Sequence, residues 1–217
     1  MRRTKTVRGA ETLGRVRLST SFFMRDFLHS EIANVHGIPN LPDDPDLAIA
    51  AGRRLCGELL EPLQAAFGRV AIRSAYRSCR LNAFGNAHYH NCASNRRNYA
   101  RHIWDRRDRD GCTGAMACIV VPWFIDRLNA GTPWWSLAWW IHDHLSYSEL
   151  QFFPKMAAFN FGWREQPKRQ IYSFVAPRGY LTRLGMPNHD GGHARFYEGF
   201  PKLERNRPTG QLALVIP

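Results

Sequence analysis

Residues 70–82 read VAIRSAYRSCRLN, and this stretch decides the fold. Its β-branched start predicts a short strand over residues 70–74 that ends at Ser74. Tyr76, Arg77 and Ser78 follow directly, before a segment that contains Asn82. An arginine just after a strand places a planar charge where sheets usually hold ligands. The alternative is a surface arginine at a strand end with no such role.

The sequence on either side predicts helices before this strand and a sheet after it. One helix should begin after Ser21 and end at Gly37, and a second should run from Pro45 to about Phe67, with a kink at Pro62. Apolar runs predict two further helices and four further strands. The helices are expected over residues 123–128 and 134–145, and the strands over 117–121, 149–153, 158–163 and 171–175.

These elements predict an α+β domain with a small mixed or antiparallel sheet of about four or five strands and flanking helices. We expect residues 19–176 to form this domain. A basic arm over residues 1–18 precedes it, and a C-terminal extension over residues 177–217 should pack on the domain or on a partner. The four tryptophans of residues 134–140 fit core packing or, alternatively, a membrane-interface or partner face.

Composition bounds the location and the partners. The 217 residues suffice for one domain with a hydrophobic core. The formal net charge of +12 favours polyanionic partners such as nucleic acid. The alternative is a generally basic composition with no nucleic-acid site. No apolar run is long enough to span a membrane, and the basic N-terminus has no apolar segment behind it, which predicts synthesis in the cytoplasm without a signal peptide. Five cysteines without a CxxC pair fit a reducing compartment.

Three stretches together resemble the peptidase M15 family, the D-Ala-D-Ala carboxypeptidase-like zinc peptidases. The helix pair with its GIPNLP linker is similar to the family's opening helices, and IRSAYRSCRLN is similar to its TSGYRS…N motif. The third stretch runs from GAMACIVVPWF through WWSLAWWIHDHL to SYSELQFFP and resembles a strand, helix and strand of the family. The resemblance covers about residues 20–165 and implies the M15 architecture and a peptidoglycan substrate.

The resemblance also implies a zinc site and a set of substrate-binding residues. In the family, zinc is held by a His and an Asp of an S-x-H-x-x-G-x-A-x-D block and by a later His, and a nearby Glu or Asp is the catalytic acid. The family's arginine, matched here by Arg77, binds the carboxylate end of the substrate. Ser74, Tyr76 and Asn82 are the other expected substrate-binding residues, and Glu149 is the candidate acid or base.

The sequence departs from the family at the zinc ligands. When Gly114 is placed on the glycine of the block, Gly111 falls where the His should be and Cys118 where the Asp should be, and Asn160 lies near the expected later His. A relocated site is one interpretation. It would take its ligands from His102, Asp108, Asp110, Cys112 and Cys118. The alternative for each is ordinary: a packed histidine, a solvated turn or a buried cysteine.

Two other interpretations stay open at this point. In the first, the chain has lost catalysis and is a murein-binding or structural component. The expected lack of a signal peptide would fit a component of a phage or prophage virion. Alternatively, the charge marks a basic nucleic-acid-binding module. The tail residues His189, Asp190 and His193 have metal-like types, but their two intervening glycines predict a loop whose polar groups face water.

Overall fold

The computed structural model describes residues 6–203 and shows an α+β protein built on one six-stranded mixed sheet. The predicted fold class is therefore confirmed, but the expected count of four or five strands was too low. The M15 architecture itself stays a prediction. The strands are β1 (Ala71–Ser74), β2 (Gly114–Val120), β3 (Glu149–Phe152), β4 (Phe159–Arg164), β5 (Gln170–Ser173) and β6 (Gly179–Thr182).

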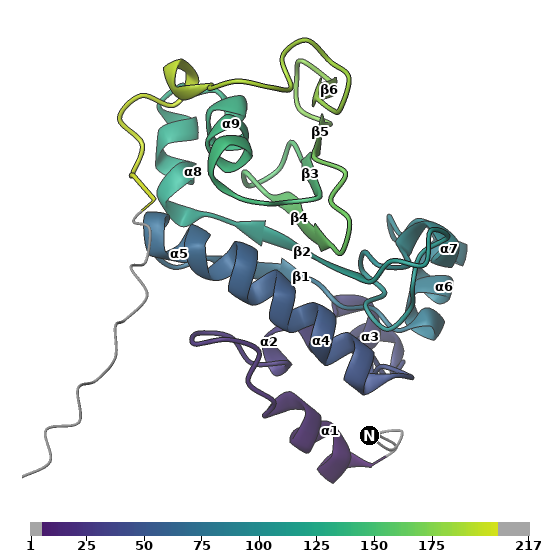
Figure 1. Ribbon diagram of the computed structural model, residues 1–217. Helices are drawn as coiled ribbons and strands as arrows, with labels where there is room; N and C mark the ends of the chain where they lie inside the picture. Colours follow the sequence, from purple (N-terminus) through teal and green to yellow (C-terminus); the bar gives the residue numbers. More distant parts are fainter. Residues whose placement is uncertain (1–5, 204–217) are drawn as a thin grey trace, which may run out of the picture.

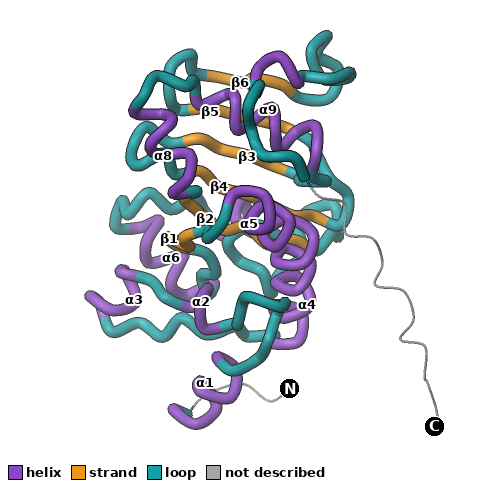
Figure 2. The backbone as a smooth tube through the Cα atoms, turned by 90° about the vertical axis from the view of Figure 1, so that its left-hand side faces the viewer, coloured by secondary structure: helices purple, strands orange, loops and turns teal. Residues whose placement is uncertain are grey.

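The order of strands in the sheet differs from their order in the chain at one place. The sheet runs β1-β2-β4-β3-β5-β6, as Figure 2 shows. All neighbouring pairs are antiparallel except β3 and β5, which are parallel. The sixth strand, β6, lies in the segment that the sequence suggested as a C-terminal extension.

Helices cover one face of this sheet and leave the other open. The α-helices are α1 (Val7–Gly14), α2 (Arg25–Leu28), α3 (Glu31–His36), α4 (Pro45–Leu55), α5 (Glu61–Phe67), α6 (Cys79–Ala87), α7 (Asn95–Asn98), α8 (Pro122–Asn129) and α9 (Trp134–His144). Two short helices of other types, η1 (Cys56–Leu60, π) and η2 (Ala194–Phe196, 3₁₀), complete them. Figure 1 shows the α4–α5 rod, α8 and α9 beside the sheet, and α6 and α7 near one end of it.

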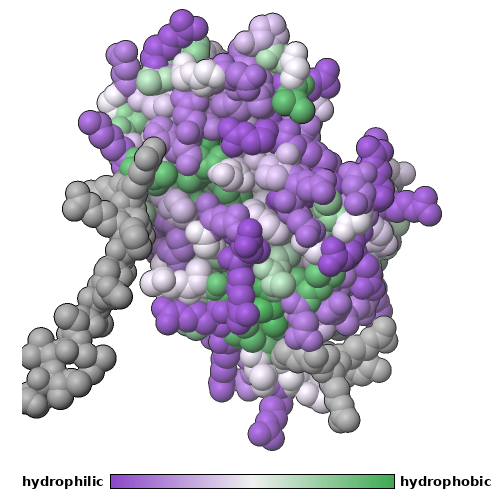
Figure 3. Space-filling model, viewed as in Figure 1, coloured by the Kyte–Doolittle hydropathy of each residue, from purple (hydrophilic) through white to green (hydrophobic). Residues whose placement is uncertain are grey.

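The core lies between the sheet and the helices α4, α5, α8 and α9. Leu55, Phe67 and Trp140 from the helices join Ala117 and Phe161 from the central strands in one buried cluster. Burial of such side chains contributes on the order of 1.5–3 kcal/mol each. In the view of Figure 3 the surface is mostly hydrophilic, with hydrophobic residues in smaller groups near the middle.

The predicted helix pair is present, with local differences. The long second helix begins where expected, with Asp44 capping the Leu47 N–H and Pro45 in the first turn. A π-helical turn, η1, stands two to six residues before Pro62, where the rod was expected to kink, and Pro62 cannot donate a helical hydrogen bond. The first predicted helix is split into α2 and α3, and Gly37 ends α3 in the left-handed conformation.

Within residues 6–203, the segments near both ends contain regular secondary structure. The predicted basic arm contains α1, which Thr6 caps and which buries Leu13. Residues 1–5 and 204–217, which belong to the predicted arm and extension, lie outside the described residues. Of the tryptophans of α9, Trp134, Trp139 and Trp140 are buried, so these three pack within the protein.

Candidate functional site

A row of six residues, one from each strand, crosses the open face of the sheet. The cross-strand register pairs them consecutively. Directly paired residues point to the same face of a sheet, so the six side chains form a continuous band. All six line one groove of about 900 Å³. In order across the sheet they are Ser74, Cys118, Asn160, Gln151, Tyr172 and Tyr180.

Arg77 lines this groove on a backbone that is held on both sides. The Asn40 amide donates to the Tyr76 carbonyl at 2.9 Å and accepts the Ser78 N–H at 2.8 Å. The Arg77 N–H itself donates to the His102 carbonyl at 2.7 Å. The Arg77 guanidinium, in contrast, makes no hydrogen bond or ion pair with any residue in the range 6–203. A rigid backbone thus presents an uncompensated, half-buried cation to the groove.

His102 lies beside Arg77 and is held in its neutral form. Its Nδ1 is 2.7 Å from the Ala75 carbonyl, an acceptor, so Nδ1 carries the proton and Nε2 carries the lone pair. Burial and the charge of Arg77 lower the pKa of His102 to about 3, although the bonds to Ala75 and to the Asn160 side chain oppose this shift. The imidazole is therefore uncharged near neutral pH, and Nε2 faces Asn160.

Cys118 occupies the row between Ser74 and Asn160. Burial raises the pKa of the thiol, and the charges of Arg73 and Arg77 offset this only in part. The sulfur is therefore protonated near neutral pH. A thiol is a weaker nucleophile and metal ligand than a thiolate.

Glu149 also lines the groove, but its carboxylate is already paired. It forms an ion pair with Arg101, and its other oxygen lies 3.4 Å from the Lys168 Nζ. The side chain is buried, whereas both cations are partly exposed. An acid or base role for Glu149 stays a prediction, and it would require the release of these two partners.

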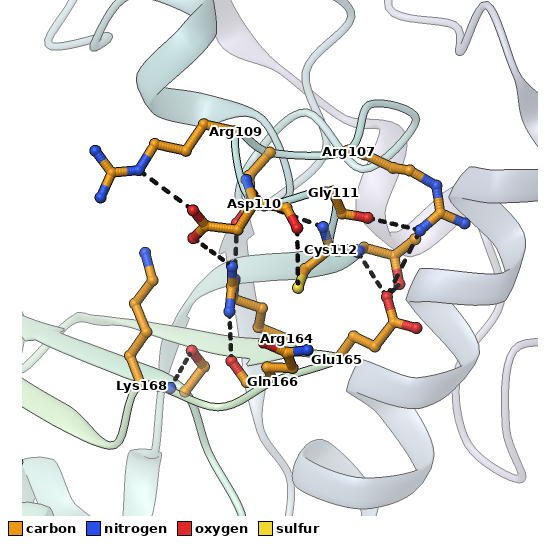
Figure 4. Close-up of polar contacts among 12 residues, drawn as sticks. Arg107, Arg109, Asp110, Gly111, Cys112, Arg164, Glu165, Gln166 and Lys168 are labelled. Carbon is orange, nitrogen blue, oxygen red and sulfur yellow. Dashed lines mark hydrogen bonds and ion pairs between the residues drawn. The ribbon is translucent and has the colours of Figure 1, made fainter.

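Asp108 and Asp110 lie outside the groove, where a buried arginine of β4 binds both carboxylates. The Arg164 Nε is 2.7 Å from Asp108. The terminal nitrogen of Arg164 is 2.8 Å from Asp110 (Figure 4). Burial alone would raise the pKa of Asp108, but the bonds from Arg164 and from the backbone N–H groups of Cys112 and Asp110 lower it. The Cys112 sulfur is buried 4.0 Å from the Asp110 carbonyl.

The structure therefore divides the predicted metal ligands between two places. His102 and Cys118 line the groove, whereas Asp108 and Asp110 line a smaller neighbouring pocket of about 230 Å³. Among residues 6–203, no group of three or more His, Cys, Asp or Glu side chains is arranged to hold a metal ion. His102 and Cys118 would supply only two ligands in the groove, whereas zinc centres usually take three or four from the protein. Zinc stays a prediction from the family resemblance, and we derive no chemistry from it.

Two of the predicted substrate-binding residues support the site from behind. Tyr76 is fully buried and donates to Asp105 at 3.2 Å, and burial raises its pKa. Asn82 donates from its amide to the Ala93 carbonyl and to Asn95. Neither side chain lines the groove. Of the four predicted residues, Ser74 and Arg77 therefore face the groove directly.

The tail histidines are buried, contrary to the expectation of a loop that faces water. The His193 Nδ1 is 2.7 Å from Asp143 of α9, and its ring stacks on Trp139 at 3.9 Å. His189 packs against His142 with ring centroids 5.1 Å apart. Partners on α9, which the local sequence does not reveal, draw these side chains inward.

Sequence reasoning did not select several residues of the groove. Asn160 and Gln151 are joined by a 3.0 Å hydrogen bond in the middle of the row. Tyr172 and Tyr180 form its far end. The sequence named Asn160 only as lying near the expected later His, and its polar side chain within the apolar run FNFGW was a local signal that it faces away from the core.

Comparison of the chain with protein-family models, with curated proteins and with solved structures finds no match. Among the described residues, no helix combines the length and the apolar character needed to cross a bilayer. The fold and the site define an α+β protein with a cationic groove on the open face of a mixed sheet.

Proposed function

We propose that this protein is a peptidoglycan-directed relative of the M15 peptidases that binds the carboxylate end of a peptide stem through Arg77. The observation that carries the proposal is the Arg77 guanidinium, which lines the groove without a partner among residues 6–203. Arginine suits this role because its planar fork can donate two parallel hydrogen bonds to one carboxylate. A virion location, suggested by the sequence, would bring such a binder to the cell wall.

The charge of the groove supports an anionic ligand. Five of its lining residues are Arg or Lys and one is Glu. Because the Arg77 backbone is already held by Asn40 and His102, binding requires no ordering of the backbone and costs only the rotamer freedom of the side chain. A charge-assisted hydrogen bond contributes about 1.5–3 kcal/mol, which corresponds to roughly 10- to 150-fold in affinity.

The side chains that could act as base or nucleophile in peptide cleavage are neutral or ion-paired, which favours binding over hydrolysis. The imidazole of His102 is a weak base because its pKa is lowered to about 3 by burial and by Arg77. The Cys118 thiol is protonated because burial raises its pKa. Glu149 is ion-paired with Arg101 and Lys168. We therefore propose a binding protein with the groove of a peptidase.

Calorimetric titration with a synthetic five-residue stem peptide tests this proposal. The peptide with a free C-terminal carboxylate should bind, and its C-terminal amide should bind at least about tenfold more weakly. Arg77→Gln should remove the preference for the acid, whereas Arg53→Gln, an exposed arginine of α4 outside the groove, should keep it. Equal affinities of acid and amide would refute carboxylate recognition. Mass spectrometry of the incubated peptide, with and without added zinc, would refute the non-hydrolytic role if products accumulate.

Binding of single-stranded nucleic acid is a second candidate, which the same excess of groove cations favours. Phosphate contacts release counterions, so such binding would weaken steeply as salt is raised. Fluorescence anisotropy of a labelled oligonucleotide at 50 and 200 mM salt separates the two candidates. Binding that falls steeply with salt and that the stem peptide cannot compete would support nucleic acid.

A further inference from the structure

The end of the groove opposite Arg77 is lined by four aromatic side chains that the proposed carboxylate contact does not use. We call Phe153, Tyr172, Phe174 and Tyr180 the ring platform. The Phe153 and Phe174 rings are stacked with centroids 5.5 Å apart and an interplanar angle of 4°. Tyr172 packs edge-on against Phe174 at 5.0 Å and against Tyr180 at 5.2 Å.

The ring platform is accessible although it is apolar. Phe174 and Tyr180 are each 44% exposed, and Phe153 and Tyr172 are half-buried. Exposed rings that are fixed by mutual stacking and grouped at the end of a groove suit the face of a ligand ring. Such contacts cost little conformational entropy because an aromatic side chain has few rotatable bonds.

The distance between the two ends of the groove matches a short extended peptide. Ser74, next to Arg77 in the groove, is four strands away from Tyr172 in the cross-strand row. Neighbouring strands are about 4.8 Å apart, so the two positions are roughly 19 Å apart. Five residues of extended peptide span about 17 Å. A peptide whose carboxylate meets Arg77 would thus present its N-terminal end to the ring platform.

The surroundings of the ring platform offer hydrogen-bonding side chains to a ring that carries polar groups. The groove residues beside it on β3 and β5 are the amides Gln151 and Gln170, which can donate to or accept from hydroxyl groups. Arg73 and Arg77 lie on and just after β1, at the far edge of the sheet, and Lys168 is paired with Glu149. The cation at the ring platform is Arg183, whose guanidinium carbon lies 4.6 Å from the centroid of the Tyr180 ring and is engaged with that ring. A sugar brings an apolar face for the rings and hydroxyl edges for the two amides, whereas the phosphate of a stacked nucleotide would have to draw Arg183 away from Tyr180.

We propose that the ring platform stacks the sugar of a muropeptide, the fragment in which a peptidoglycan sugar carries the N-terminal end of the stem peptide. The stem crosses the strands along the row and ends with its carboxylate at Arg77. This inference rests on the proposed function, because it assigns the same ligand a second contact.

The test compares N-acetylmuramyl pentapeptide with the free pentapeptide by calorimetry. We expect the sugar to increase the affinity about tenfold, near the upper end of what an aromatic contact contributes. Phe174→Thr and Tyr180→Thr should abolish this gain without changing the affinity for the free peptide. Tyr180→Phe, which keeps the ring, should retain it. Tyr89→Asn, at an exposed tyrosine outside the groove whose φ of 58° asparagine tolerates, should have no effect.

The outcomes separate this inference from the proposed function. Binding of the free peptide with no gain from the sugar overturns the ring platform and leaves carboxylate recognition intact. A gain from the sugar that survives Arg77→Gln but not Phe174→Thr supports the ring platform and overturns carboxylate recognition. Binding of neither peptide overturns both. If an oligonucleotide binds and loses affinity in Phe174→Thr and Tyr180→Thr while the muropeptide does not bind, the ring platform serves nucleic acid and the inference is wrong.

Discussion

Asn40→Ala should destabilise the protein and loosen Arg77 at the same time. The Asn40 side chain is buried and makes three hydrogen bonds, to the Leu28 carbonyl at 2.9 Å, the Tyr76 carbonyl at 2.9 Å and the Ser78 N–H at 2.8 Å. At about 1 kcal/mol for each bond, their loss should lower the free energy of unfolding by about 3 kcal/mol. For a protein of this size the midpoint of thermal unfolding should then fall by about 6–12 °C.

Urea unfolding followed by tryptophan fluorescence measures this loss, and titration with the stem peptide measures the second effect. The affinity should fall in Asn40→Ala even at temperatures where the variant is fully folded, because the Arg77 backbone loses its flanking support. Asn129→Ala, an exposed asparagine at the end of α8, is the matched control and should change neither quantity. A loss of stability below about 1 kcal/mol would refute the view that Asn40 holds this segment.

Three further predictions concern other parts of the site. Burial and Arg77 lower the pKa of His102 to about 3, below its unfolded value of about 6.5, so the free energy of unfolding should be constant above pH 6.5 and fall by up to about 1.4 kcal/mol per pH unit between pH 6.5 and 3. His102→Asn, which can still donate to the Ala75 carbonyl, should abolish this pH dependence. Urea titrations at several pH values measure it. Gly114→Ala should unfold the protein or destabilise it by more than about 3 kcal/mol, because the added Cβ would clash with the Ala100 carbonyl oxygen. A thermal unfolding midpoint within about 2 °C of wild type would contradict this. Arg164→Met should cost about 3 kcal/mol in the same assay, because it leaves a largely buried carboxylate unpaired, and an unchanged midpoint would show that this ion-pair network contributes nothing.

The sequence was sufficient to predict five of the six strands but not their register. Five of the six strands follow from apolar and β-branched runs, and all five overlap the observed elements. The sixth, β6, has only four residues in a segment rich in Gly and Pro, so its local pattern is weak. Which side chains share the row depends on pairing between segments as distant as Ser74 and Cys118, and local periodicity does not contain that information.

The same limit explains the mixed outcome for the candidate site. Arg77 and His102 were selected separately, and the structure brings them together in one groove. Asp108 and Asp110 had suitable chemistry, but Arg164 lies more than fifty residues later in the chain and binds both. A carboxylate in a sequence gives no sign of a distant cation that will neutralise it.

The cross-strand row also determines how the protein can tolerate small insertions in its gene. Because side chains alternate between the two faces, one extra codon within β4 would turn Asn160 toward the helices and a neighbouring phenylalanine, Phe159 or Phe161, toward the open face. The insertion would disrupt the core, where a polar amide would replace an aromatic ring, and the groove, where a ring would replace the amide. Length changes should therefore accumulate between strands, where they leave the alternation intact.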